Sequence, residues 1–359
     1  MDEARWLLCG EDARCLVTAL GKPEVASAMS ETNAEEDNSS SAFAGEHRSL
    51  GARSLADEFV ARFWGVRGSY PVSGGADQQI GGNTSCVEVQ VGGHEIILDA
   101  GTGLIPLGRR FRESLNVSPP TITIIFSHLH YDHILGLPFF DPLYQPGTRL
   151  YLAGPRLAGR DFSDMLGRAI TSPYFPVDLH DAPSTCQFYT IEPGDYLQWR
   201  PGDLQPHVQR EQLNGGQKRP TGDDVRMRFL HSAAHPRNGC LISRIEYQGH
   251  SLVYATDVEW GQADSQQLVH FAEGADLLIH DAQYSEEDYF ASKRGFGHST
   301  AHMATEVARA AGVKHLLLFH HDPEYDDDAL EHLQNTAQRA FPETRLAFEG
   351  LEVSLLQAP

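Results

Sequence analysis

The chain has 359 residues, 41% of them hydrophobic, and carries 49 acidic against 28 basic side chains, for a formal net charge of −21. This length and apolar content allow a full hydrophobic core. The acidic balance argues against broad nucleic-acid binding, which needs Lys and Arg to neutralise phosphates, and against electrostatic attachment to anionic membranes, so we expect no stable nucleic-acid partner and no membrane partner.

The first 58 residues differ in composition from the rest. They hold 12 acidic and 5 basic residues, and the stretch 27–41 is polar and without periodicity. We therefore predict a disordered or loosely attached tail over 1–58 and a folded domain over 59–359. The N-terminus lacks the basic and long apolar regions of a signal peptide, and the five cysteines form no Cys-x-x-Cys pair, so we expect a cytoplasmic protein without a disulfide framework.

From residue 59 onward, short apolar runs typical of strands recur along the chain. They lie at 59–66, 85–91, 95–98, 121–126, 149–152, 226–230, 240–247, 251–255, 276–279, 315–319 and 345–355. Glycine-containing turns at 92–94 and 248–250 predict two β-hairpins. The patterns at 299–311 and 327–340 predict helices, and strands followed by helices in each half predict a layered α/β domain.

The segment 142–224 is rich in Pro and Gly and shows little regular pattern. We expect it to form loops and short helices over one face of the core. Five aromatic residues in or just before it could line a pocket, although ordinary packing is the favoured interpretation: Phe139, Phe140, Tyr144, Tyr174 and Phe175.

A dense group of metal-binding residue types follows the apolar run 122–126. His128, His130, Asp132 and His133 lie within six positions, directly after a predicted strand. Alternate residues of an extended segment project to the same side, so His128 and His130 can bind one ion, while Asp132 and His133 face a second. Imidazole and carboxylate are ligands for zinc, manganese or iron, and the lack of thiolate argues against a purely structural zinc site.

Further candidate ligands follow later strands. His235 and Asp257 precede polar turns after apolar runs, and His320 directly follows the run 315–319. Polar residues at such positions collect at one edge of a sheet. These residues predict two sets around a bridging Asp257: His128, His130 and His235 for one metal, and Asp132, His133 and His320 for the other. His231 and His321 remain alternatives to their neighbours His235 and His320.

Together these motifs resemble the metallo-β-lactamase fold superfamily, and the resemblance extends over about 59–356. It implies a four-layer αββα sandwich. Residues 98–103 (Leu-Asp-Ala-Gly-Thr-Gly) resemble the superfamily's strand-end turn, in which Asp99 supports the metal-site loop without binding metal. Where Asp257 stands, true β-lactamases usually carry Cys, and the carboxylate suits a bridged dinuclear centre.

Residues 65–69 and 81–85, with Gly-His-Ser-Thr at 297–300, look like the phosphodiesterase-type branch of this superfamily. That branch includes tRNase Z, class II cyclic-nucleotide phosphodiesterases and a cyclic-phosphate phosphodiesterase. The resemblance implies that His298 hydrogen-bonds a phosphoryl oxygen or protonates the leaving group. We expect Asp281 to orient either His298 or a metal ligand. The expected catalytic residues are His298 and Asp132, and a homodimer is a further expectation from this branch.

We therefore expect a hydrolase with two divalent ions, zinc before manganese or iron, that cleaves a small anionic phosphodiester such as a cyclic nucleotide with a metal-activated hydroxide. The alternatives are a thioester or lactone hydrolase with the same centre, a metal-binding sensor without turnover, and an RNA-processing nuclease. The absence of a long basic arm argues against the nuclease.

Overall fold

Two β-sheets form the centre of the molecule. The computed structural model describes residues 58–73, 79–112, 118–211, 222–236, 239–261 and 265–356. The first sheet has the strand order β15-β1-β2-β3-β4-β5-β6 and the second β14-β13-β12-β11-β10-β9-β7-β8. Of the predicted tail at 1–58, all but the last residue lies outside the described residues.

The strands of the first sheet are β1 (Phe59–Gly65), β2 (Cys86–Val91), β3 (His94–Leu98), β4 (Thr121–Ile125), β5 (Arg149–Pro155), β6 (Thr185–Ile191) and β15 (Glu352–Ser354). Those of the second are β7 (Asp195–Trp199), β8 (His207–Arg210), β9 (Val225–Ser232), β10 (Cys240–Tyr247), β11 (His250–Ala255), β12 (Leu277–Asp281), β13 (His315–Phe319) and β14 (Thr344–Leu346). Both predicted hairpins form, since β2 pairs antiparallel with β3 and β10 with β11.

The α-helices are α1 (Leu104–Phe111), α2 (Tyr131–Ile134), α3 (Phe162–Ala169), α4 (Ser265–Ala272), α5 (Glu286–Asp288), α6 (Ala301–Ala311) and α7 (Asp327–Ala340). Short 3₁₀ turns cover Leu137–Phe139, Asp141–Tyr144 and Leu179–Asp181, and a π-helical turn covers Tyr289–Lys293. In the described part of the chain, no helix has the length and apolar content that a membrane span requires.

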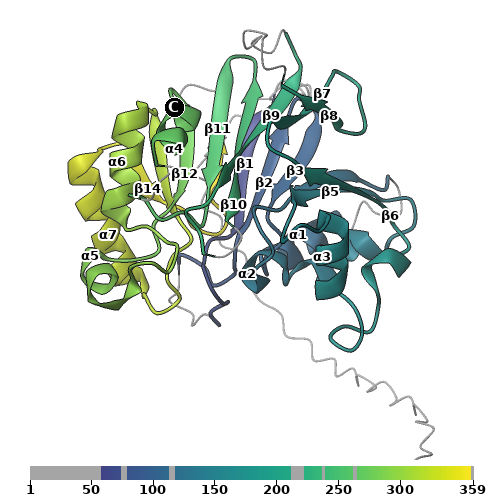
Figure 1. Ribbon diagram of the computed structural model, residues 1–359, viewed down its shortest axis with the longest axis horizontal. Coiled ribbons are helices and arrows are strands. Elements are labelled where there is room, and N and C mark those ends of the chain that lie inside the picture. Colours follow the sequence, from purple (N-terminus) through teal and green to yellow (C-terminus); the bar gives the residue numbers. More distant parts are fainter. Residues whose placement is uncertain are drawn as a thin grey trace, which may run out of the picture. The chain divides into compact units, whose positions relative to one another are not determined.

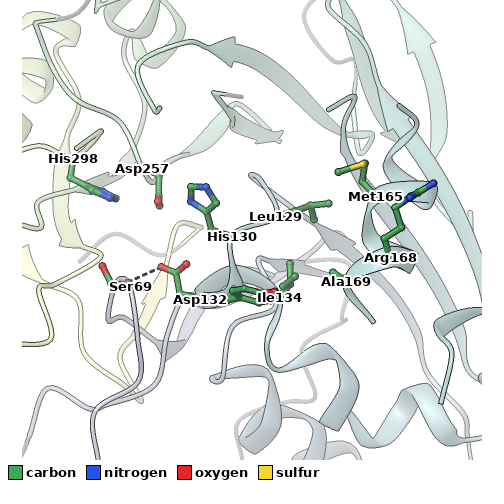
Figure 2. A pocket seen from close by; sticks show the side chains of 11 residues that line it. Ser69, Leu129, His130, Asp132, Ile134, Met165, Arg168, Ala169, Asp257 and His298 are labelled. Carbon is green, nitrogen blue, oxygen red and sulfur yellow. Dashed lines mark hydrogen bonds between the residues drawn. The ribbon is translucent and has the colours of Figure 1, made fainter. Parts of the chain in front are cut away.

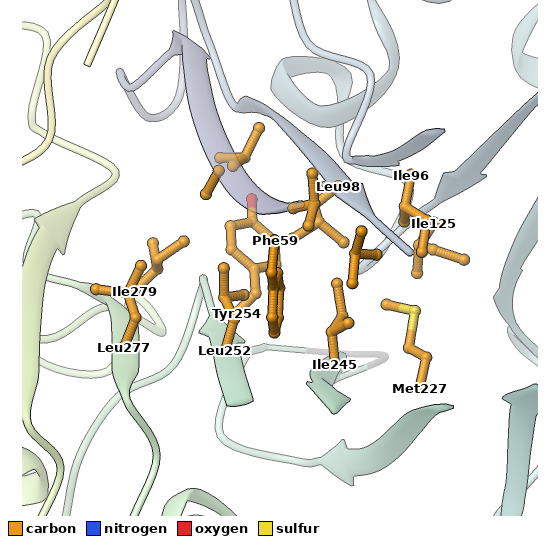
Figure 3. Close-up of a cluster of buried hydrophobic side chains, with 14 of the residues drawn as sticks. Phe59, Ile96, Leu98, Ile125, Met227, Ile245, Leu252, Tyr254, Leu277 and Ile279 are labelled. Atoms are coloured by element: carbon orange, nitrogen blue, oxygen red, sulfur yellow. The ribbon is translucent and has the colours of Figure 1, made fainter. Parts of the chain in front are cut away.

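Three apolar clusters separate four layers. The cluster between the sheets includes Phe59, Leu98, Met227, Tyr254 and Ile279 (Figure 3). A second packs α4, α6 and α7 on the outer face of the second sheet, and a third packs α1 and α3 on the outer face of the first. Figure 1 shows these helices on opposite sides of the sheet pair. The predicted αββα sandwich is thus what the chain forms.

Helix α6 shows how local sequence sets an element's limits. The hydroxyl of Thr300 accepts a hydrogen bond from the Met303 N–H at 3.2 Å, so the cap is Thr300 rather than Ser299. Gly312, with φ of +62°, ends the helix in the left-handed region that glycine favours. The predicted helix at 327–340 matches α7.

The segment 142–224 differs from its prediction. The predicted strand at 149–152 is confirmed as β5, but the segment also supplies β6, β7 and β8, which complete the edges of both sheets. Strands β6 and β8 are largely half-buried or exposed, so their sequences lack the apolar run that marks a central strand. The predicted strand at 345–355 is also divided, into β14 and β15 of different sheets.

Candidate metal centre

The candidate residues meet because several strands end at one edge of the sandwich. Strands β11, β12 and β13 run parallel, so the residues that follow them emerge together. Strand β4 of the first sheet delivers residues 127–133 to the same place, where the Leu241 N–H donates a 2.8 Å hydrogen bond to the Ser127 carbonyl of the other sheet.

The first set brings three imidazoles together. His235 Nε2 lies 3.1 Å from His130 Nδ1, and the rings of His128 and His130 are 4.4 Å apart between centroids. One ligand atom each from His128, His130, His235 and Asp257 all lie within 4.8 Å of one another. The structure thus gathers the residues of the first predicted set, with Asp257 beside them.

The second set is equally close. His133 Nε2 lies 3.3 Å from His320 Nε2, and Asp132 Oδ2 lies 3.4 Å from the former and 3.2 Å from the latter. Both histidines and the carboxylate are buried. These three residues also form a group with mutually close ligand atoms.

Asp257 faces the two sets with different oxygens. Its Oδ1 lies 3.2 Å from His133 Nε2 and 3.3 Å from His320 Nε2. Its Oδ2 lies 3.5 Å from His128 Nε2 and 3.7 Å from His235 Nε2. A carboxylate placed this way can join two cations, one per oxygen.

The spacing and chemistry of these atoms fit divalent cations. Ligands about 2.0–2.2 Å from one tetrahedral zinc are roughly 3.3–3.6 Å apart, close to the separations found here. Within the described part of the chain, the buried His128 Nε2 has no hydrogen-bond partner, as expected of an atom reserved for a ligand. A site whose ligand atoms are all nitrogen or oxygen suits zinc, manganese or iron.

The hydrogen bonds behind the histidines fix their tautomers. His133 Nδ1–H donates to Asp99 at 2.8 Å, His235 Nδ1–H to the Gly297 carbonyl at 3.1 Å, and His320 Nδ1–H to Gln283 Oε1 at 3.1 Å. Each bond directs Nε2 toward the centre, the arrangement that metal-binding histidines use.

Asp99 holds the loop that carries the first four candidates. Its Oδ1 accepts from the Ser127 N–H at 2.7 Å, and its Oδ2 accepts from the Ser127 hydroxyl, His133 Nδ1–H and the Tyr254 hydroxyl, each at 2.8 Å. Asp99 is fully buried and supports this loop from behind, as the resemblance implied.

Electrostatics set different protonation preferences within the centre. Burial alone would lower the pKa of His133, but Asp257, Asp132 and Asp99 raise it well above its ordinary value. Burial, and then the neighbouring His133, lowers the pKa of His128 well below its ordinary value, so its imidazole is neutral. Burial alone would raise the pKa of Asp257, but His320 and His133 outweigh it and hold that pKa well below its usual range. Asp257 is therefore an anion between neutral or cationic rings.

His298 stands beside the two sets without belonging to either. Its Nδ1 lies 2.7 Å from Asp281 Oδ2, and its ring stacks on His320 with centroids 5.0 Å apart. Burial alone would lower the pKa of His298, but Asp281 raises it to about 9. With Nδ1–H donated to Asp281, the Nε2–H of a protonated ring is available to a bound anion.

Three positioning residues were missed in the sequence. Ser69 N–H donates to Asp132 Oδ2 at 2.7 Å, and the Ser69 hydroxyl accepts from Gln283 Nε2 at 3.0 Å. Gln283 thereby connects Ser69 to His320. Glu259, also buried, accepts from the N–H groups of Gly295 and Gly297 just before His298. Ser69 lies in the motif 65–69, but no sequence signal marks its role or singles out Gln283 and Glu259, since only tertiary structure brings these side chains to their partners.

The alternatives left open by the sequence lie elsewhere. His321 is buried and donates from Nε2 to the Ala347 carbonyl at 2.9 Å, and burial lowers its pKa to about 3. His231 lies within β9, outside the groups of close ligand atoms among the described residues. The geometry therefore brings His235 and His320, rather than these neighbours, to the centre.

Backbone strain concentrates at this site. Four non-glycine residues, Ser69, Asp99, Asp257 and His320, have φ between +53° and +62°. A side chain rarely adopts this left-handed conformation, and surrounding contacts must hold it there.

An open cavity of about 570 Å³ lies in front of the centre. Ser69, His130, Asp132, Asp257 and His298 line one part of it (Figure 2). The five aromatic residues predicted as pocket candidates are not among the described residues that line it. Phe140, for example, is buried in the core against Phe111.

Comparison with known proteins identifies relatives. A family model described as the β-lactamase superfamily domain matches residues 192–321. Ribonuclease Z of Metallosphaera sedula is 30% identical over 277 residues, covering 70% of this chain and 86% of that protein. Ribonuclease Z of Brevibacillus brevis is 42% identical over 103 residues, but the match covers only 28% of this chain and 31% of that protein.

Among solved structures, the metallo-β-lactamase fold protein YhfI from Bacillus subtilis is similar, with a TM-score of 0.56 and 22% identity. The match covers 83% of this chain and 99% of that one. This likeness confirms the predicted fold.

The relatives also correct one prediction. The expectation of a small phosphodiester substrate and no stable nucleic-acid partner is wrong, because the relatives are ribonucleases. That expectation rested on a net charge of −21 summed over the whole chain, of which residues 1–58 carry −7. Recognition depends on the local charge of a site, to which any bound cation also contributes, and not on the net charge of the whole chain.

Proposed function

Because the chain belongs to the metallo-β-lactamase superfamily, in the branch that contains ribonuclease Z, we propose that this metal-dependent phosphodiester hydrolase acts on RNA. The observation that carries the proposal is the Metallosphaera sedula ribonuclease Z, which this chain matches over most of that protein's length. The geometry of the metal centre and of His298 supports the same chemistry.

We assign two zinc ions to the centre. His128, His130 and His235 would hold one, and Asp132, His133 and His320 the other. Asp257 would contact both through its separate oxygens, 3.2–3.7 Å from the nearest nitrogens of each set. When bound, the two cations supply an activated water and neutralise charge on the phosphoryl oxygens.

The chain's own residues orient the substrate and move protons. His298 has a proton on Nε2 because Asp281 accepts from its Nδ1 and raises its pKa. It donates that proton to a phosphoryl oxygen or to the departing ribose oxygen. The Ser69 hydroxyl accepts a hydrogen bond from Gln283. Its own proton is therefore free to point into the cavity, toward the same phosphoryl or ribose oxygen.

A metal and turnover assay tests this function. Purified wild-type protein is analysed for zinc, manganese and iron, and is then assayed with a precursor-tRNA transcript, single-stranded RNA and bis(p-nitrophenyl) phosphate. We expect two metal ions per chain and RNA cleavage that a chelator abolishes. Asp257→Ala should lose both, whereas the matched variant His231→Ala should keep both, because His231 lies outside the metal sets. RNA turnover by metal-free protein would overturn the proposal.

A further inference from the structure

The cavity in front of the metal centre has two chemically different ends. Its polar end holds the residues of the metal centre, Ser69 and His298. The other end is mainly apolar and carries one cation, with six lining residues: Leu129, Tyr131, Ile134, Met165, Arg168 and Ala169. Figure 2 shows Met165, Arg168 and Ala169 across the cavity from His130 and Asp132. The volume of about 570 Å³ falls in the range of small-ligand sites.

Helix α3 builds one wall of the apolar end. Phe162 and Leu166 are fully buried in the cluster that packs this helix onto the first sheet. Met165 and Ala169 are four positions apart and hence neighbours on the helix surface, where both line the cavity. The wall is thus fixed to the same sheet that delivers residues 127–133.

The opposite wall comes from the metal-site loop itself. Tyr131 stands between His130 and Asp132, yet its side chain is 73% exposed. The Tyr131 ring is therefore accessible to a ligand bound in the cavity. Flat aromatic surfaces of this kind stack with nucleobases regardless of sequence.

Arg168 supplies the positive charge at this end. Its Nε donates to Asp164 Oδ1 at 3.0 Å, which leaves the protons of both terminal nitrogens for a ligand. Its side chain is 60% exposed, so the ion pair with Asp164 is weak and open to competition. Arg160 pairs with the same carboxylate at 3.1 Å but does not line the cavity.

We propose that the apolar end is a subsite for one unpaired nucleotide adjacent to the scissile phosphodiester. Its base stacks on Tyr131 and packs against Met165, while Arg168 binds the phosphate that joins this nucleotide to the next. The inference rests on the proposed function, because an RNA substrate bound at the metals places a nucleotide on each side of the bond that breaks. The subsite selects single-stranded RNA, since a base within a helix cannot reach the tyrosine face.

The matched arginines provide the first test. For a single-stranded oligoribonucleotide, we expect Arg168→Ala to lower kcat/KM about tenfold and to reduce the slope of log(kcat/KM) against log(salt) by about 0.7, the value for one lost phosphate contact. Hydrolysis of bis(p-nitrophenyl) phosphate should fall much less and should keep its salt dependence, because this substrate has no second phosphate for Arg168 to bind. Arg160→Ala should leave both the slope and kcat/KM near wild type.

A spectroscopic test addresses the base. An oligoribonucleotide with 2-aminopurine beside the scissile phosphate should lose fluorescence on binding to the metal-loaded protein. Tyr131→Phe should retain that quenching and Tyr131→Ala should abolish it, with unchanged metal content in both variants.

The outcomes separate the two levels of inference. If wild-type protein does not cleave RNA, the proposed function fails and the subsite fails with it. If it cleaves RNA but Arg168→Ala and Arg160→Ala have equal effects, or the quenching survives in Tyr131→Ala, the subsite alone is wrong.

Discussion

Glu259 accepts a 3.0 Å hydrogen bond from the backbone N–H of Gly297 through Oε2, directly before the candidate general acid His298. Its Oε1 accepts from the Gly295 N–H at 2.9 Å and the Tyr289 hydroxyl at 2.7 Å. The Gly297 carbonyl in turn accepts from His235 Nδ1–H. One buried carboxylate therefore fixes a loop that serves both a proposed metal ligand and His298.

We predict that Glu259→Ala lowers kcat much more than it raises KM, because the loop no longer holds His298 in place. The free energy of unfolding should fall by about 3 kcal/mol, since buried donors lose a charged acceptor. Steady-state kinetics and urea unfolding measure both. Tyr289→Phe, which removes only one of the three bonds, is the control and should show a small fraction of each effect.

Asp281→Asn should shift the pH dependence of catalysis. His298 acts in its protonated form, and the Asp281 carboxylate raises its pKa to about 9, so activity falls as pH rises through that pKa. Asparagine removes the negative charge, lowers the pKa of His298 and moves this falling limb of the kcat/KM profile to lower pH. His298→Ala should lose about 10²–10⁴-fold in kcat and abolish the limb. An unmoved limb in Asp281→Asn would show that another group titrates.

Gly68→Ala should weaken metal binding by the second set, Asp132, His133 and His320. A Cβ at residue 68 would lie 2.4 Å from the imidazole atoms of His320, closer than real Cβ contacts. The ring must move away from the centre, so metal per chain should fall and unfolding should become about 1–3 kcal/mol easier. Elemental analysis and thermal unfolding check this, and full metal content in a folded variant would contradict the assignment of His320.

Tyr254→Phe tests the support behind the metal-site loop. The Tyr254 hydroxyl donates to Asp99, and its loss should lower the free energy of unfolding by about 1.5–3 kcal/mol, the range for a hydrogen bond to a charged group. The matched control is Tyr196→Phe, because the Tyr196 ring contacts Arg226 through its face, which phenylalanine keeps. Equal stability of the two variants in urea would argue against a structural role for this bond.

The predicted domain boundary can be tested by removing residues 1–58. The hydrolase domain is proposed to start at 59, where β1 begins and pairs with β2 and β15. We expect the shortened chain to keep the same Tm, metal content and RNA turnover as the full chain. A lower Tm would show that the acidic segment packs on the domain.

The sequence alone predicted the central strands and the residues that gather at the metal centre. Those strands are buried on both faces and read as apolar runs, as in β13, and their ends carry residue types with an evident chemistry, such as His320. Edge strands were not predicted because their half-exposed positions carry polar residues, as in β8.

Positioning residues such as Gln283 and Glu259 could not be predicted for a different reason. An amide or carboxylate has no distinct sequence signature until the fold supplies its partner, here Ser69 from 214 positions earlier for Gln283. The expectation of no nucleic-acid partner was wrong because net charge describes the whole chain and not the cavity.

The left-handed backbone at Asp257 and His320 has a consequence for engineering. Each such conformation costs about 1–3 kcal/mol, and glycine would relieve it while deleting the functional side chain. Directed evolution for heat resistance alone, without a screen for turnover, should therefore drift toward glycine at these two positions. The most thermostable survivors of such a campaign would be folded proteins that have lost their catalysis.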